Sequence, residues 1–329
     1  MHFATPILAL ASLASTANAA VVPAHLGSLA SKDNQAQSAC TSPAKRQEWR
    51  SLSSETRAEY MGAVKCLFTK PSRIGLKTSL YEDFPYIHSK LNTEIHFVAQ
   101  FLPWHRLFLN MYEAALHECG YASPMPYWDW TQDAGALPAS AVVQEFGGNG
   151  AGGGWSSPAR PNPLTSCVTA GPLAGTTLTY YAGAERAHCL NRQLNNGTGG
   201  AKEALWGAAD YAPANIARIV DGSPDFATFA DRLENGPHGA IHNAVGGDLV
   251  PSSSPNDPLF MLHHAQVDRL WARWQQAGGA ARDADFGGKR LDKSPATLQD
   301  VLPYMGLGPD MAIDKVMTTQ NDVLCYTYV

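Results

Sequence analysis

Two stretches with helical patterning flank one long irregular segment, and this arrangement limits the possible fold more than any other feature. Apolar residues recur at helical spacing over residues 91–118, 224–245 and 257–277. Between residues 124 and 200 the chain is dense in Gly, Pro, Ser and Thr, as in "FGGNGAGGGW". Such composition predicts loop with a strand or two at most. We therefore expect a mainly α fold wrapped by long loops.

Local signals place several helix ends. Pro103 divides residues 91–118 into two helices, because proline is accepted in a first turn but not in a helix interior. Asp257 and Pro258 form a cap and first-turn pair before the last helical stretch. Ser53 or Ser54 is the expected cap of an earlier helix that follows it.

Composition and charge bound the class of protein. The chain has 329 residues, of which 45% are hydrophobic and 16% charged, enough for one sizeable domain or at most two. A formal net charge of −5 offers no basic surface for nucleic acid. Beyond the N-terminus no apolar run is long enough to span a bilayer, so we expect no membrane partner.

The N-terminal sequence predicts secretion. Residues 1–19 contain an apolar run that ends in a small-x-small site, as in a signal peptide cut after Ala19. The alternative is a disordered N-terminus, because the charged part of the signal is weak. Residues 20–38 are predicted to be a linker or pro-segment, and residues 39–329 the folded domain. A glycosylation sequon at Asn196 agrees with an extracellular protein.

The six cysteines form an even set without CxxC spacing, which favours three disulfides in an oxidising compartment over a metal cluster. Six cysteines allow fifteen pairings, and the sequence alone does not select one. Our preferred set is Cys167 with Cys189, Cys66 with Cys119, and Cys40 with Cys325.

Seven of the eleven histidines fall into two groups, while His117 and His188 lie beside cysteines. The spacing of four in "HGAIH" puts two rings on one helical face, as two ligands of one metal require. A helix break at Pro103 would let histidines on both sides of it converge. A lone histidine is more often structural, but two sets of three suit a binuclear copper site, with zinc still possible. The groups are His88, His96 and His105, and His238, His242, His263 and His264.

Two longer motifs, "HFVAQFLPWHRLFLNMYE" and "DPLFMLHHAQVDRLW", resemble the copper motifs of tyrosinases and catechol oxidases, the type 3 copper proteins. The resemblance implies a four-helix bundle that holds two copper ions, binds dioxygen between them and oxidises o-diphenols to o-quinones. Asp268 selects His264 over His263 by the family's spacing, which leaves His263 either to support a ligand from behind or to pack in the core, and Phe260 would lie over the ion pair. The implied ligands are His88, His96 and His105 for copper A, and His238, His242 and His264 for copper B.

Several positions near the motifs depart from the family's pattern or refine it. Glu94 stands where many fungal relatives carry a thioether-forming cysteine, so no such crosslink is expected. Glu234 matches a glutamate that orients a water near copper B. Relatives that hydroxylate monophenols well often have an asparagine where this chain has Gly239, and Asn243 is the nearest substitute. Without that asparagine, the base that takes the proton of the incoming phenol should be weaker. We therefore expect stronger oxidation of diphenols than hydroxylation of monophenols.

Three other functions stay open at this stage: a tyrosinase with full monophenolase activity, a hemocyanin-like oxygen carrier and a binuclear zinc hydrolase. Because the chain stops at Val329, soon after its "YTY" motif, we expect no shielding domain over the site. The aromatic "PYWDWTQD" segment is interpreted as core, without a catalytic role. Asp268 and Arg269 are expected to form structural hydrogen bonds and ion pairs behind the ligand helix.

Overall fold

The computed structural model describes residues 40–151, 166–195 and 207–329. The predicted signal peptide, the linker and the sequon at Asn196 lie outside these ranges. Within them, no helix has the length and apolar character needed to cross a membrane.

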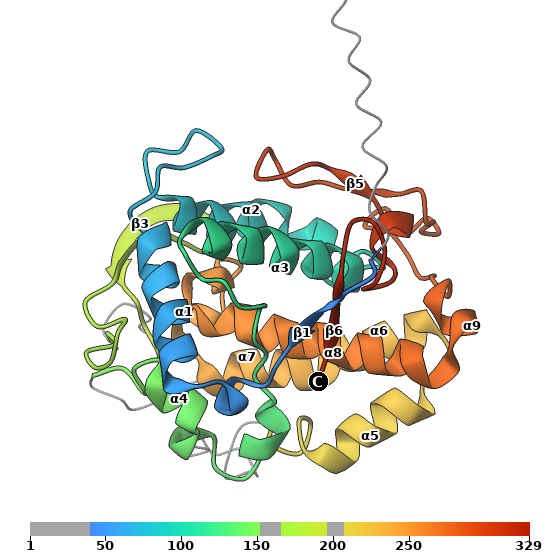
Figure 1. Ribbon diagram of the computed structural model, residues 1–329, viewed down its shortest axis with the longest axis horizontal. Helices are drawn as coiled ribbons and strands as arrows, with labels where there is room; N and C mark the ends of the chain where they lie inside the picture. The colour runs from blue at the N-terminus through green and yellow to red at the C-terminus, as the bar shows by residue number, and fades with distance from the viewer. Residues whose placement is uncertain (1–39, 152–165, 196–206) are drawn as a thin grey trace, which may run out of the picture. The chain divides into compact units, whose positions relative to one another are not determined.

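A four-helix bundle forms the centre of the fold, as the sequence predicted (Figure 1). Between α2 and α3, Phe84 packs edge-on against Phe108 with ring centroids 5.3 Å apart. A five-residue π-helical turn, Glu234–His238, joins the two short helices α6 and α7. The bundle consists of α2 (Leu80–Ile95), α3 (Phe101–Glu118), α6 (Phe226–Leu233) with α7 (Gly239–Val245), and α8 (Leu259–Gly278).

The break between α2 and α3 lies where the proline signal placed it, although the first helix is longer than predicted. Pro103 is the third residue of α3, where its missing N–H has no helical partner to lose. Helix α2 begins at Leu80 rather than near residue 91, after a loop that ends at Ser79. The turn between the helices holds Phe97 at φ 57°, a left-handed conformation that is uncommon for an aromatic residue.

The remaining helices pack around the bundle. The side chain of Ser53 accepts the N–H of Thr56 at 3.1 Å, so Ser53 rather than Ser54 caps α1 (Ser54–Leu67). Helix α5 (Pro213–Gly222) packs against α8 and was not predicted. Two short helices, α4 (Ala141–Glu145) and α9 (Ala280–Asp283), complete the α structure of the described ranges.

Three small two-stranded sheets connect distant parts of the chain. Strands β2 (Thr177–Tyr181) and β3 (Ala184–Cys189) form the antiparallel hairpin that the irregular middle segment allowed. Strands β1 (Ala44–Arg46) and β6 (Tyr326–Tyr328) run parallel, and β4 (Val301–Leu302) pairs antiparallel with β5 (Met311–Ala312). Pairing between opposite ends of a chain leaves no local sequence pattern, so β1 and β6 were missed.

The three disulfides are those we preferred. Cys40 bonds to Cys325 beside the β1–β6 pair, and Cys66 bonds to Cys119. Cys167 bonds to Cys189 at the end of β3. Their Cα atoms are 5.3–5.9 Å apart, within the usual range.

Asp268 is the centre of a buried polar network behind α8, which confirms its structural role. It accepts hydrogen bonds from Nε of Arg106 at 2.5 Å and from the hydroxyl of Tyr326 at 2.6 Å. The hydroxyl of Tyr328 donates to the same carboxylate at 2.5 Å, and Arg46 lies 3.6 Å away. The arginines and tyrosine hydroxyls outweigh burial and lower the pKa of Asp268, so the carboxylate stays charged.

Candidate metal centre

The first histidine group comes together at the junction of α2 and α3. His88 lies within α2, His96 is the residue at which α2 ends, and His105 lies in the second turn of α3, slightly deeper than the first-turn position expected. The ring centroids are 4.9 Å apart between His88 and His96, and 5.1 Å between His96 and His105. The Nε2 atoms of His88 and His105 are 3.4 Å apart. Three ring nitrogens therefore converge on one point.

The second group is built from α7 and α8. His238 and His242 are one turn apart, with their Nε2 atoms 3.1 Å from each other, as the "HGAIH" spacing predicted. The ring of His264 lies 5.0 Å from that of His238 and 5.7 Å from that of His242. His263 is also within this cluster, 4.8 Å from His242 between ring centroids.

The two groups face each other across the bundle. His105 and His264 stack with their ring centroids 4.3 Å apart and an angle of 13° between the planes. His96 and His238 form a second, looser stack at 6.1 Å. His263 instead lies toward Trp130, 6.3 Å away between ring centroids. This placement favours His264 over His263 as the ring shared between the two groups.

Backbone carbonyls orient most of these rings. In each of five rings Nδ1 donates to a carbonyl oxygen, which leaves the lone pair on Nε2 and points it into the cluster. The carbonyls belong to Ser252 for His88, Asn92 for His96, Phe101 for His105, Glu234 for His238 and Leu249 for His242, at distances of 2.5–3.2 Å.

Burial keeps the rings uncharged. It lowers the pKa of every histidine in both groups, and neighbouring histidines lower most of them further. For His96 and His242, which are half-buried, burial lowers the pKa to about 4. The site thus presents neutral nitrogen donors at neutral pH.

The residues fit a pair of metal ions. Both ring nitrogens of His264 are buried without a hydrogen-bond partner in the described structure, and the same is true of His263. Unpartnered nitrogens in a dry site are costly unless a cation satisfies them. Neither group includes a carboxylate or thiolate, and an all-imidazole donor set suits copper or zinc rather than calcium or magnesium.

Phe260 and Gly239, which stay predicted pocket residues, both adjoin the histidine groups. The ring of Phe260 is 4.1 Å from that of His264 and 5.0 Å from that of His88, so it contacts both groups. Gly239 follows His238 on α7, and a Cβ added to it would meet only the carbonyl of Glu234, at 3.5 Å. A Cβ at position 239 is therefore accommodated without a clash.

Glu234 and Asn243 occupy different environments. Glu234 is buried, and Oε1 of its carboxylate accepts the backbone N–H of Phe97 at 2.8 Å. Burial raises the pKa of Glu234 to about 8, against the opposing effect of that hydrogen bond. Asn243 is exposed and donates its amide to the carbonyl of Gly239 at 2.8 Å.

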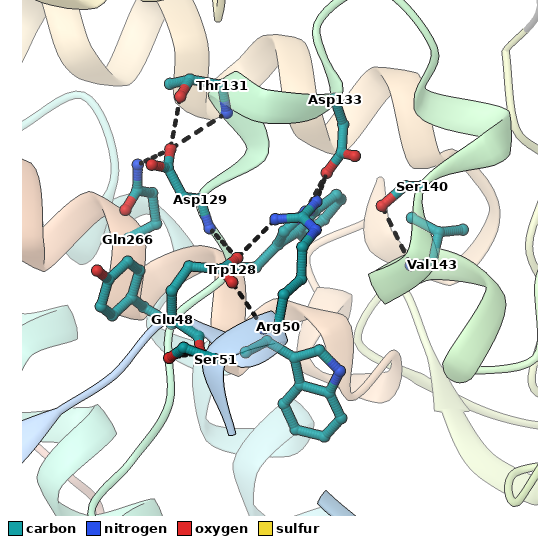
Figure 2. Close-up of polar contacts among 12 residues, drawn as sticks. Glu48, Arg50, Ser51, Trp128, Asp129, Thr131, Asp133, Ser140, Val143 and Gln266 are labelled. Carbon is teal, nitrogen blue, oxygen red and sulfur yellow. Dashed lines mark hydrogen bonds and ion pairs between the residues drawn. The ribbon is translucent and has the colours of Figure 1, made fainter. Parts of the chain in front are cut away.

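The "PYWDWTQD" segment packs against α8, with the ring centroid of Trp130 6.3 Å from that of His263, and Figure 2 shows its contacts with Gln266 and Arg50. The backbone N–H of Trp128 donates to the carbonyl of Leu262 at 3.1 Å, just before the paired histidines. Asp129 accepts the amide of Gln266 at 2.9 Å, and Asp133 accepts the indole N–H of Trp128 at 2.7 Å. Arg50 forms an ion pair with Asp133, the last residue of the segment. The segment is core, as predicted, and it braces α8.

Sequence reasoning missed the groups that orient the rings. The carbonyls of Leu249 and Ser252 have no sequence signature, because every residue has one. The left-handed conformation of Phe97 was also unforeseen, since glycine is the usual residue there. The sequence gives no signal for the role of His188, because its partner Asp248 lies 60 residues further along the chain.

Comparison with known proteins supports one family. Residues 78–277 match the family model described as the common central domain of tyrosinase. The chain is 41% identical over 311 residues to the tyrosinase-like protein phomQ1 of Diaporthe leptostromiformis, covering 88% of this chain and 78% of the relative. It is 30% identical to tyrosinase P of Aspergillus terreus over 339 residues, covering 88% and 93%.

A solved structure agrees. A Gly-to-Asn mutant of polyphenol oxidase from Thermothelomyces thermophila superposes with a TM-score of 0.73 at 30% identity, covering 89% of this chain and 91% of that one. This family implies a binuclear copper centre, and the two facing histidine groups are consistent with one. The chain belongs to the tyrosinase family of type 3 copper proteins.

Proposed function

We propose that this protein is a secreted catechol oxidase that converts o-diphenols to o-quinones with dioxygen. The observation that carries the proposal is the pair of facing imidazole groups joined by the His105–His264 stack. Copper A is assigned to His88, His96 and His105, and copper B to His238, His242 and His264. Two ions held this way supply the redox chemistry: two catechols lose four electrons and four protons, and one dioxygen becomes two waters.

The residues around the ions bind and orient the phenol. Six neutral imidazoles do not compensate the charge of the ions, so an anionic phenolate is favoured in the pocket. Phe260 provides an apolar surface that both histidine groups touch. The substrate enters beside His96 and His242, the two half-buried rings, because the other assigned ligands are buried.

Diphenol oxidation is proposed to exceed monophenol hydroxylation. Hydroxylation needs a base that takes the phenol proton beside the copper pair. Glu234 already accepts the N–H of Phe97, and position 239 carries no amide to complete a water site. Asn243 donates its amide to Gly239 instead. A catechol is more acidic and needs less help, so it reacts faster.

Initial rates on a monophenol and its matching catechol test this proposal, with copper-loaded protein and both products followed. We expect rapid quinone formation from the catechol and slow or no turnover of the monophenol. Faster turnover of the monophenol would make the protein a tyrosinase with full monophenolase activity. Reversible oxygen binding without catechol loss would make it a carrier, and two tightly bound zinc ions would make it a hydrolase.

Secretion is part of the proposal. Three disulfides favour an oxidising compartment. Expression in a fungal host should release the protein into the medium, with its N-terminus at Ala20 or later by protein sequencing. Retention inside the cell with residues 1–19 intact would contradict it.

A further inference from the structure

A short buried segment, His188–Arg192, lies against both stretches of backbone that place the second histidine group. It begins at the end of β3, where Cys189 is bonded to Cys167. The loop after α7, which follows His242, packs on one part of it. The start of α8, which carries His264, packs on another. The segment thus touches both halves of the assigned copper B site without supplying a ligand.

His188 fixes the loop after α7 through Asp248. Its Nε2 donates to Oδ1 of Asp248 at 2.8 Å, and the two side chains are 1% and 0% exposed. The other carboxylate oxygen accepts the N–H of Asn191 at 2.7 Å, and the N–H of Asp248 donates back to the carbonyl of Asn191 at 2.9 Å. The next residue, Leu249, provides the carbonyl that orients His242.

Arg192 fixes the start of α8 through Asp257. Its guanidinium forms two parallel hydrogen bonds to that carboxylate, at 2.9 and 2.8 Å, and both side chains are fully buried. Oδ1 of Asp257 accepts the N–H of Leu259, the first residue of α8, at 3.0 Å. His264 lies five residues further along that helix.

The contact between the segment and the loop is backbone to backbone. Gly246 and Gly247 both have positive φ, 69° and 55°. A Cβ on Gly246 would lie 2.2 Å from the carbonyl oxygen of Gln193, and one on Gly247 would lie 2.3 Å from that of Asn191. No side chain fits between the backbone of the His188–Arg192 segment and that of the loop after α7. A shift of the segment would therefore move the loop with it.

We propose that His188 and Arg192 are positioning residues for copper B, holding His242 and His264 in place through Asp248 and Asp257. This inference rests on the proposed copper assignment. It gives the Gly-rich middle segment of the chain a function, because its hairpin and disulfide bring the two side chains to the site. The described residues show no hydrogen bond from this segment to a copper A ligand, and the loop between Asp248 and Asp257 reaches copper A only through the carbonyl of Ser252, which orients His88. The effect on copper B, which the segment supports on both sides, should therefore be the larger one.

The test measures copper release by a chelator and copper content in the intact protein. His188→Leu should release one of its two ions about 10–100-fold faster than wild type and change the release of the other much less. Loss of one ion from a coupled pair produces a mononuclear Cu(II) signal in electron paramagnetic resonance, which the intact pair lacks. His117→Leu is the matched control, because that exposed histidine donates to the carbonyl of Ser123 and should keep wild-type release.

Double variants identify which ion is lost. His188→Leu combined with His105→Ala should hold almost no copper, whereas His188→Leu combined with His264→Ala should hold as much as His264→Ala alone. Release of both ions at equal rates, or wild-type release from a folded His188→Leu protein, would overturn the inference. If His188→Leu does not fold, the same copper-release measurements are made on Arg192→Lys, and the same results support or overturn the inference. Lysine keeps the charge of Arg192 but loses its two parallel hydrogen bonds.

Measurements on the wild-type protein distinguish a failure of this inference from a failure of the proposed function. If it does not bind two copper ions or oxidise catechol, the proposed function fails. If it does both and the variants still retain copper B, only the role of His188 and Arg192 fails.

Discussion

The imidazole of His105 on α3 lies almost parallel to that of His264 on α8, with ring centroids 4.3 Å apart. This stack joins two helices that are distant in sequence and sets the two nitrogen groups face to face. Stacked neutral rings orient each other only weakly, so their alignment depends on the helices beneath. The networks behind α8, at Asp268 and at Asp129, provide that support.

The two adjacent histidines of α8 should differ in their effect on copper content. His264→Ala should reduce bound copper from about two ions to about one, because it removes a ring that faces both groups. His263→Ala should retain about two, since that ring lies toward Trp130. Elemental analysis of purified, copper-loaded variants measures both. The reverse result would move the assignment to His263.

Gly239→Asn should raise monophenol hydroxylation. A Cβ at this helical position meets only the carbonyl of Glu234, at 3.5 Å, and an added amide would help Glu234 hold a water. We expect the ratio of monophenol to diphenol rates to rise about tenfold, at the low end of general-base effects. Steady-state kinetics on paired substrates measures the ratio. Gly62→Asn is the matched control, because this exposed glycine of α1 has nothing within 4 Å of an added Cβ, and an equal rise there would contradict the explanation.

Asp268→Asn should destabilise the protein in a pH-dependent way. Removing the charge leaves the buried Arg106 without its carboxylate partner, while Arg46 keeps its ion pair with Glu113, at a cost of about 3–5 kcal/mol in the free energy of unfolding. Because the pKa of Asp268 is lowered on folding, its contribution is complete above the unfolded value of 3.8 and is lost as the pH falls through the folded value.

The difference between wild type and this variant should therefore be constant above about pH 5 and shrink on further acidification. Denaturant unfolding at several pH values measures it. Asp314→Asn is the control, since that carboxylate is exposed beside Lys315 and should change stability little at any pH. A difference that grows toward low pH would contradict the assignment of charge.

Phe97 tests the strain in the turn between α2 and α3. Phe97→Gly relieves the left-handed conformation and keeps the N–H that Glu234 accepts, so stability should be unchanged or about 1 kcal/mol higher. Phe97→Val should be about 1–2 kcal/mol less stable, because a β-branched residue tolerates positive φ poorly. Chemical denaturation ranks the three proteins. Met305→Gly, at φ 51°, is a control for strain away from the site.

The histidine groups were predictable because their chemistry is local. The spacing of His238 and His242 fixes one helical face, and Pro103 marks the break that lets His96 and His105 converge. Helix α8 was equally predictable, because its apolar residues recur at helical spacing. These features depend on residues within a few turns of each other, which is the range that patterning can report.

What remained hidden depends on partners far along the chain. The β1–β6 pair joins residues near 45 and 327, and α5 is stabilised by packing on α8 more than by caps, since Ala212 at its start offers no side-chain bond. His188 could be recognised only once Asp248 lay beside it. A buried hydrogen bond between side chains 60 residues apart has no local signature.

The Cys40–Cys325 bond closes nearly the whole domain into a covalent ring. A single cleavage of the backbone anywhere between these two cysteines opens the ring but cannot part the fragments, because a second path of covalent bonds still joins them. A protease that nicks one surface turn would therefore leave both histidine groups in one molecule. Under reducing gel conditions the same nicked protein would separate into two bands, whereas without reductant it would migrate as one.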